Sequence, residues 1–300
     1  MDTINIKNVT VCGAGVLGGQ IAFQTAFHRF NVTIYDISNE ILEKATIKFK
    51  LLSKTYKKDI SATQKEVDAA IARIKFSTNL KEATKDADLV IEAIPENIRV
   101  KKEFYIQLAK VAPLKSIFCT NSSTLLPSMF AQETGRPERF LALHFSNLIW
   151  KHNTAEIMGH PTTSPKVFEA IVDFSKAIGM VALPIHKEQS GYILNSLLAP
   201  FLRSALHLYV NNISDPETID KTWIKASGSP MGPFGICDVV GITTICNINK
   251  ILADTGDELS KMIVKELQEN FISKGKLGIP TGKGFYNYPN PAYEQEDFLK

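Results

Sequence analysis

The sequence has few cysteines and little net charge. Its 300 residues include 4 Cys, and 34 basic residues against 31 acidic ones give a formal net charge of +3. A net charge this small excludes a protein that binds DNA or RNA through a large basic surface. The cysteines, at positions 12, 119, 237 and 246, are too scattered for a zinc pattern or a disulfide framework. We therefore expect no metal site, and we expect buried free thiols in a reducing compartment.

The pattern of a membrane span and that of a secretion signal are also missing. Segment 116–132 is free of charged residues, but it contains several polar residues and Pro127, and it falls short of the roughly 18 apolar residues that a span needs. A strand-like run begins already at Asn8, which leaves no room for the regions of a signal peptide. We therefore expect a cytoplasmic protein without membrane contact.

What the sequence does contain is a regular alternation of β-branched runs and helical patterns over about the first two hundred residues. Alternation of this kind predicts an α/β fold of Rossmann type with a mostly parallel sheet. The strands are expected at residues 8–12, 31–36, 73–77, 87–94, 116–120, 140–145, 155–158 and 180–185.

Two helical patterns, at residues 40–58 and 62–74, lie between the second and third expected strands. A simple crossover needs one helix, so segment 37–74 is predicted to contain an inserted helical hairpin. The hairpin should turn near Asp59, with Ser61 and Gln64 as a capping box.

The alternation stops near Gln189, and every later segment has a helical pattern. We therefore predict two domains, an α/β domain at residues 1–187 and an all-α domain at residues 188–300. The helix expected from Tyr192 to Tyr209 is apolar on nearly all faces, so it should lie in a domain core or in a subunit interface.

A glycine-rich loop follows the first strand. Residues Gly13, Gly15 and Gly18 form the pattern G-x-G-x-x-G, with Val16 and Leu17 between them. The first glycine allows a tight turn, the second lets the backbone approach a pyrophosphate, and the third lets helix and strand pack closely. The pyrophosphate would lie at the helix N-terminus, where free N–H groups favour an anion.

An acidic residue, Asp36, follows at the end of the second strand, in the place where a carboxylate accepts both hydroxyls of an adenine ribose. The same charge would repel a 2′-phosphate, and the residues that follow, Ile37 and Ser38, include no Arg to hold one. We therefore predict that the domain binds NAD rather than NADP.

Polar residues also follow the later strands, at the sheet edge where ligands of open parallel sheets bind. His144 ends the strand at 140–145, so its imidazole is a candidate for proton transfer beside the nicotinamide. Glu156 begins the next strand and could hold this imidazole, or it could be a surface carboxylate. The segments 95–97 and 121–123 could line the crevice, or they could cap the next helical segments.

The predicted hairpin is rich in lysine. Such a run is usually a solvated helix face, but beside the crevice it could also contact a phosphate-rich substrate. The lysines are Lys44, Lys48, Lys50, Lys54, Lys57 and Lys58.

An ordered series of motifs extends over nearly the full length of the chain and is far more specific than the glycine loop alone. The motifs are residues 13–18, Asp36, 92–97 with Lys101, 121–123, 136–140, 144–145, 191–195, 230–233 and 281–286. With this series the sequence resembles the L-3-hydroxyacyl-CoA dehydrogenases, including the 3-hydroxybutyryl-CoA dehydrogenases.

The resemblance implies roles for single residues. His144 would take the proton of the substrate's C3 hydroxyl, with Glu156 as its partner. Ser123 would bind the substrate oxygen and touch the nicotinamide, and Asn195 would help to place the substrate. The hairpin would hold part of coenzyme A, and the helical domain would form a homodimer. Glu96, Lys101 and Asn147 would line the nicotinamide half of the NAD site.

The sequence departs from the family pattern after the candidate base. Where the family usually has Phe-Phe-Asn-Pro, residues 145–148 are Phe-Ser-Asn-Leu, which removes a proline from the loop. The main hypothesis is NAD-dependent interconversion of a short-chain L-3-hydroxyacyl-CoA and its 3-oxoacyl-CoA. Two alternatives stay open: a dehydrogenase of a free hydroxy acid, such as a sugar acid or a carnitine-like compound, and a catalytically silent NAD-binding dimer.

Overall fold

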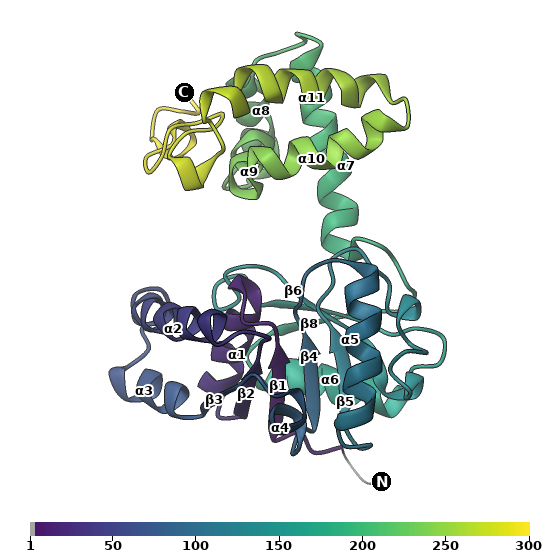
Figure 1. Ribbon diagram of the computed structural model, residues 1–300. Coiled ribbons are helices and arrows are strands. Elements are labelled where there is room, and N and C mark those ends of the chain that lie inside the picture. The colour runs from purple at the N-terminus through teal and green to yellow at the C-terminus, as the bar shows by residue number, and fades with distance from the viewer. Residues whose placement is uncertain (1–3) are drawn as a thin grey trace. The chain divides into compact units, whose positions relative to one another are not determined.

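The computed structural model describes residues 4–300 (Figure 1). The chain divides into two compact units, the first ending at Ile193 and the second running from Leu194 to Lys300.

The first unit is built on an eight-stranded sheet in the order β3-β2-β1-β4-β5-β6-β7-β8. Within residues 4–300 one pair of neighbouring strands is antiparallel, β6 with β7, and the other pairs are parallel. The expected Rossmann-type, mostly parallel sheet is thereby confirmed. The strands are β1 (Asn8–Cys12), β2 (Asn31–Tyr35), β3 (Ile74–Ser77), β4 (Leu89–Glu92), β5 (Ile117–Thr120), β6 (Phe140–Phe145), β7 (Thr154–Met158) and β8 (Val181–Ile185).

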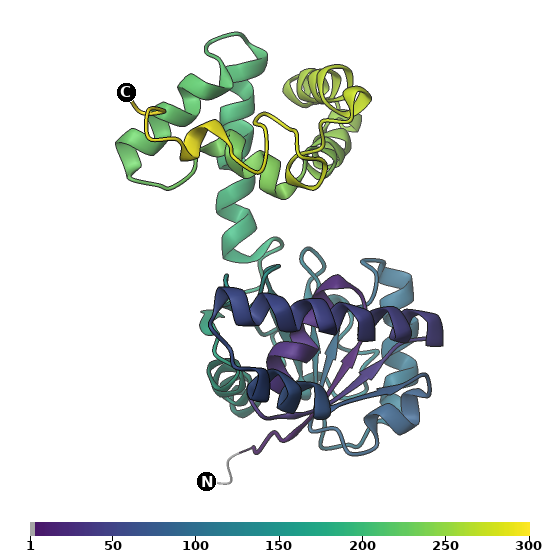
Figure 2. The same cartoon turned by 90° about the vertical axis from the view of Figure 1, so that its left-hand side faces the viewer.

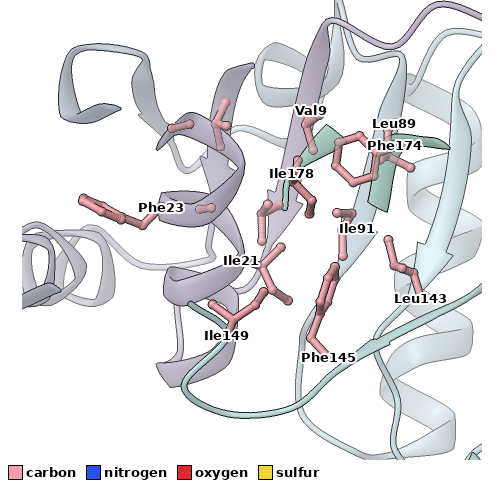
Figure 3. Close-up of a cluster of buried hydrophobic side chains, with 14 of the residues drawn as sticks. Val9, Ile21, Phe23, Leu89, Ile91, Leu143, Phe145, Ile149, Phe174 and Ile178 are labelled. Atoms are coloured by element: carbon pink, nitrogen blue, oxygen red, sulfur yellow. The ribbon is translucent and has the colours of Figure 1, made fainter. Parts of the chain in front are cut away.

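Helices cover both faces of this sheet, because its central strands carry apolar side chains on both sides. Val9, Ile91 and Leu143 point to one face, where they meet Ile21 of one helix and Phe174 of another (Figure 3). A second buried cluster, which includes Phe118 and Tyr105, fills the opposite face. The helices are α1 (Val16–Phe27), α2 (Asn39–Asp59), α3 (Gln64–Ala72), α4 (Leu80–Thr84), α5 (Ile98–Val111) and α6 (Pro165–Ala177).

Helices α2 and α3 form the inserted hairpin, which lies in front of the sheet in Figure 2. Its long helix packs on α1, where the rings of Tyr56 and Phe23 meet edge to face at 4.8 Å. The turn falls at Asp59 as predicted, but the expected capping box of Ser61 and Gln64 is wrong. Thr63 and Glu66 form it instead, because Ser61 takes a left-handed conformation with φ +56° and the helix starts later.

The second unit is all helical apart from its C-terminal segment, as predicted. Its core gathers apolar side chains from several helices, among them Phe234, Ile263 and Leu267. The helices are α7 (Tyr192–Val210), whose first two residues belong to the first unit, α8 (Pro216–Ser227), α9 (Pro233–Val240), α10 (Ile242–Asp254) and α11 (Glu258–Asn270).

Helix α7 is the one helix in the described part of the chain that is long and apolar enough to cross a membrane, by length and composition alone. The sequence pattern did not single it out in this respect. Within its unit, Arg203 of this helix pairs with Asp257 at 2.8 Å and with Ser260 at 2.7 Å. Across residues 4–300, no group of His, Cys, Asp and Glu side chains could hold a metal ion.

Candidate active site

The glycine loop turns between β1 and α1, and each of its glycines has a different reason to be there. Gly13 has φ +106°, and a Cβ at that position would collide with the carbonyl oxygen of Ala93. A Cβ at Gly18 would collide with the carbonyl of Gly13, so this glycine allows close packing. At Gly15, apart from the glycine itself and its neighbours along the chain, no atom of residues 4–300 lies within 4 Å of where a Cβ would be. The loop therefore keeps open space at the position where the motif brings backbone toward a pyrophosphate.

A pocket of about 240 Å³ lies at this loop. The first turn of α1 forms one wall, and the N–H groups of that turn have no partners within the helix. These features fit a dinucleotide phosphate. The pocket is lined by Gly15, Val16, Leu17, Gly18, Ala93, Ile94, Glu96, Lys101, Asn121, Ser123 and Thr124.

Asp36 lies directly after β2 and is tied to the glycine loop. Its Oδ2 accepts a hydrogen bond from the Ala14 N–H at 2.7 Å, and its Oδ1 accepts one from the Ile37 N–H at 2.8 Å. The carboxylate therefore has a fixed position beside the loop, as an acceptor for ribose hydroxyls requires.

The antiparallel pairing of β6 and β7 brings the candidate base and its candidate partner together. His144 and Glu156 are directly opposite each other in the register of these strands. His144 Nδ1 lies 3.0 Å from Glu156 Oε2, and both side chains are buried. On the other side of the ring, Ser123 Oγ lies 3.1 Å from His144 Nε2.

This arrangement fixes the chemistry of the imidazole. A carboxylate can only accept, so the proton between the two groups belongs on Nδ1, and Nε2 then carries a lone pair. A base of this kind can take a proton from a hydroxyl placed near Ser123, and the carboxylate of Glu156 stabilises the imidazolium that forms.

Glu96 joins the loops after β4 and β5. Its Oε1 accepts hydrogen bonds from the hydroxyls of Ser122 at 2.5 Å and Thr124 at 3.0 Å, and Lys101 Nζ lies 3.3 Å from its Oε2. Burial raises the pKa of Glu96, but the hydrogen bond from Ser122 and the charge of Lys101 outweigh it and hold the pKa below its usual value. Glu96 is therefore a charged acceptor at the wall of the pocket.

Beneath the pocket lies a buried charge that the sequence pattern did not single out. Glu92, the last residue of β4, is fully buried, and Lys101 Nζ lies 2.5 Å from its Oε1. Tyr105 and Thr120 donate hydrogen bonds to its Oε2 at 2.9 and 2.8 Å. A carboxylate that ends an otherwise apolar strand at the ligand-binding edge was the signal that could have identified it.

Four other predicted contacts are not part of this cluster. Asn147 is exposed in the loop after β6, and the six hairpin lysines are also exposed. Asn195 lies on the first turns of α7, in the second unit, so its role stays a prediction. Asn97 caps α5 by accepting from the N–H groups of Arg99 and Val100, which is the capping role considered above.

The fold and this site together define the class of the protein, an NAD-dependent dehydrogenase. Residues 8–189 match the family described as 3-hydroxyacyl-CoA dehydrogenase, NAD binding domain, and residues 191–288 match 3-hydroxyacyl-CoA dehydrogenase, C-terminal domain. The chain belongs to the 3-hydroxyacyl-CoA dehydrogenase family, and NAD is its cofactor.

Known proteins can be aligned with nearly the whole chain. The mitochondrial hydroxyacyl-coenzyme A dehydrogenase of Homo sapiens is 35% identical, in an alignment that covers 95% of this chain and 92% of that protein. A probable 3-hydroxybutyryl-CoA dehydrogenase of Bacillus subtilis is 32% identical, over 95% of this chain and 98% of that protein.

Two solved structures have the same fold. A diketoreductase, described as acting in the dual catalysis of dicarbonyl compounds, has a TM-score of 0.91 and 50% identity, covering 96% of this chain and all of that one. The (S)-3-hydroxybutyryl-CoA dehydrogenase of Ralstonia eutropha has a TM-score of 0.82 and 28% identity, covering 95% of this chain and all of that one.

Proposed function

We propose that the protein interconverts a short-chain L-3-hydroxyacyl-CoA and the corresponding 3-oxoacyl-CoA. In the oxidising direction, His144 Nε2 takes the proton of the C3 hydroxyl while the hydride leaves C3, and a C=O bond forms. NAD, when bound, accepts that hydride. The observation that carries this proposal is the row formed by the half-buried Ser123 and the buried His144 and Glu156, with spacings of 3.1 and 3.0 Å.

Each of the other site residues has a proposed part. Ser123 Oγ orients the substrate oxygen toward Nε2, and Asn195 helps to place the substrate. Glu96, Lys101 and Asn147 hold the nicotinamide half of the cofactor. Asp36 binds the adenine ribose, and the loop 13–18 binds the pyrophosphate.

The direct test is oxidation of NADH in the presence of acetoacetyl-CoA. Removing a general base typically lowers the rate by about 10²–10⁴-fold, so we expect a loss of that size in kcat for His144→Ala. The exposed His152 supplies the control, because His152→Ala should keep the wild-type rate. A His144→Ala rate equal to that of the wild type would refute the mechanism, and NAD binding without turnover would favour the silent dimer.

A second candidate substrate is a dicarbonyl compound that is not a CoA thioester. Two observations favour it: the 50% identity to the diketoreductase, and the changed loop after His144. In this loop Trp150 donates to Asp59 at 2.9 Å and packs on Tyr56, so the loop is attached to the hairpin that would hold coenzyme A. The ratio of kcat/KM for acetoacetyl-CoA to that for a free diketo ester decides between the two.

We also propose that the second unit forms a homodimer. Its helices expose large apolar side chains, including Leu197 at 70% and Ile251 at 68% of their full accessibility. Where large apolar side chains gather on an exposed surface, they mark a site of association. Light scattering should give a dimer for the wild type and a monomer for the double variant Leu197→Asp/Ile251→Asp, whereas a wild-type monomer would contradict the proposal.

A further inference from the structure

The segment that enters α7 has a conformation that bulky residues rarely adopt. Gly191 has φ +80°, and Tyr192, the first residue of the helix, has φ +55°. For a tyrosine this left-handed conformation costs energy, and such residues persist where the surroundings hold them, often at functional sites. The side chain of Tyr192 is fully buried in the first unit.

The ring of Tyr192 is held by the candidate base itself. The two rings are stacked, with centroids 4.5 Å apart and planes only 18° from parallel. One face of the His144 imidazole is thereby covered by a rigid neighbour. The hydrogen bonds to Glu156 and Ser123 act in the ring plane, so they do not prevent the imidazole from tilting out of that plane. The stacked ring of Tyr192 restrains this tilt.

The phenol of Tyr192 reaches the loop that carries the catalytic serine. Its O–H donates to the carbonyl oxygen of Ser122 at 2.8 Å. Burial raises the pKa of this phenol, so it stays a donor across the working range of pH. The contact fixes the peptide that joins Ser122 to Ser123, and with it the place of the Ser123 hydroxyl.

The residues on either side of Tyr192 hold the same site. The Ile193 N–H donates to Glu156 Oε1 at 2.9 Å, while Oε2 of that carboxylate faces His144. The hydroxyl of Ser190 donates to the carbonyl of Thr124 at 2.8 Å. Segment 190–193 therefore contacts all three parts of the row: the serine loop, the imidazole and the carboxylate.

We propose that Tyr192 is a positioning residue for the His144 base. Its ring sets the plane of the imidazole, and its hydroxyl sets the distance between Ser123 Oγ and Nε2. This inference rests on the proposed function, in which Nε2 accepts the substrate proton. It assigns no proton transfer to Tyr192.

Two substitutions separate the ring from the hydroxyl. Tyr192→Leu removes both, and we expect kcat to fall about 10²-fold, because small misplacements of catalytic groups cost factors of this size. Tyr192→Phe keeps the ring, so we expect a loss of only about threefold to tenfold from the freed serine loop. The Kd for NADH, measured by fluorescence, and the KM for acetoacetyl-CoA should stay within about threefold of the wild type, since the effect falls on the base.

Phe174 is the matched control, because it is also a large buried aromatic residue of the first unit, with its ring 5.2 Å from that of Phe30. Phe174→Leu should lower the Tm and leave kcat near the wild-type value, as expected for a purely structural aromatic residue. The proposal would be overturned if Phe174→Leu lowered kcat as much as Tyr192→Leu does at an equal loss of Tm.

A readout without substrate keeps this inference separate from the proposed function. In ¹⁵N-edited spectra, the His144 signal, identified by its loss in His144→Ala, should show one tautomer in the wild type and in Tyr192→Phe. In Tyr192→Leu it should show a mixture and lose the ring-current shift of the stacked phenol. If His144 keeps one tautomer in Tyr192→Leu, Tyr192 does not position it, whichever substrate the enzyme uses. If the wild type turns over neither substrate while the tautomer responds as expected, the proposed function fails and the positioning role of Tyr192 stands.

Discussion

The two units bury carboxylates in different ways. In the first unit, Glu92 faces a cation, Lys101, whose side chain is only 1% exposed. In the second unit, Asp220 and Asp238 are buried, and no basic side chain among residues 4–300 forms an ion pair with either. Each accepts hydrogen bonds from two backbone N–H groups and a tyrosine hydroxyl.

The difference shows what each carboxylate does. Glu92 holds the ammonium group of Lys101 at the wall of the candidate cofactor pocket, so it positions a charge that lines this pocket. Asp238 accepts from the N–H groups of Phe285 and Tyr286, and thereby clamps the C-terminal segment to α9. A Cβ at Gly284 would collide with this aspartate, which is why the segment needs a glycine there.

The largest effect on stability should come from breaking the charged pair. Lys101→Met leaves Glu92 as a buried charge without its cation, which typically costs about 3–5 kcal/mol of unfolding free energy. The double variant Glu92→Gln/Lys101→Met should recover much of this loss. The unfolding free energy is measured by urea unfolding in a Trp223→Phe background. This substitution removes the tryptophan of the second unit, so the fluorescence of Trp150 reports on the first unit.

Lys102 provides the control for this experiment, because it pairs with Glu133 while 42% of its side chain is exposed. A pair of this kind contributes at most about 1 kcal/mol. Equal losses for Lys101→Met and Lys102→Met would show that burial of the first pair is not what makes it important.

A smaller loss of unfolding free energy is expected for Asp238, whose carboxylate accepts hydrogen bonds from neutral donors. Asp238→Ala leaves two backbone N–H groups without their acceptor, at a typical cost of about 1–3 kcal/mol for each buried donor. Trp223 in a Trp150→Phe background reports on the second unit. Asp254→Ala, at the exposed end of α10, should have little effect, and a loss at Asp238 no larger than that would contradict the clamp.

Local sequence patterns predict much of this fold, but they do not predict contacts between strands or unusual backbone conformations. Strands β1 and β6 have the predicted bounds, because continuous apolar runs mark buried parallel strands. The direct pairing of His144 with Glu156 depends on strand register, which no local pattern encodes. The positive φ of Tyr192 was hidden for a similar reason, since the segment has an ordinary helical pattern.

In the site, Glu92 was not singled out by the sequence pattern for the same reason. Its partners Lys101, Tyr105 and Thr120 come from a helix and a neighbouring strand, so only the folded sheet brings them to one carboxylate. The capping box failed because Ser61-Gln64 and Thr63-Glu66 have the same spacing. The choice between them depends on where the turn after α2 ends.

Two carboxylates, Asp238 in the second unit and Glu96 in the first, should respond oppositely to pH. Burial raises the pKa of Asp238 above its usual value, although hydrogen bonds from Tyr286 and Phe285 act against it. Its stabilising contribution is therefore complete below the unfolded pKa of about 4 and is lost as the pH rises through the folded pKa. The Tm advantage of the wild type over Asp238→Asn should shrink as the pH rises from about 3 to 7.

The stabilising contribution of Glu96, in the first unit, should change with pH in the opposite direction. Its pKa is lowered in the folded protein, so its contribution is present above the unfolded pKa and is lost as the pH falls through the folded value. The Tm advantage of the wild type over Glu96→Gln should therefore grow over the same rise in pH. Parallel slopes for the two variants would contradict this assignment.

The smallest effect on stability should come from the exposed charges of the hairpin. Lys54, Lys57 and Lys58 are all solvent-exposed, so neutralising them to Gln should change the unfolding free energy by less than about 0.5 kcal/mol each. If coenzyme A lies against the hairpin, the triple variant should nevertheless raise the KM for acetoacetyl-CoA about threefold to tenfold, because an exposed ion pair with a phosphate is worth a fraction of a kcal/mol. The KM for a free diketo ester should stay the same, and so should kcat for both substrates. Unchanged KM values for both substrates would remove the hairpin from the substrate site and favour the smaller dicarbonyl substrate. In that case the buried charges of the first unit would serve the reaction, and the exposed lysines would only keep a helix face in water.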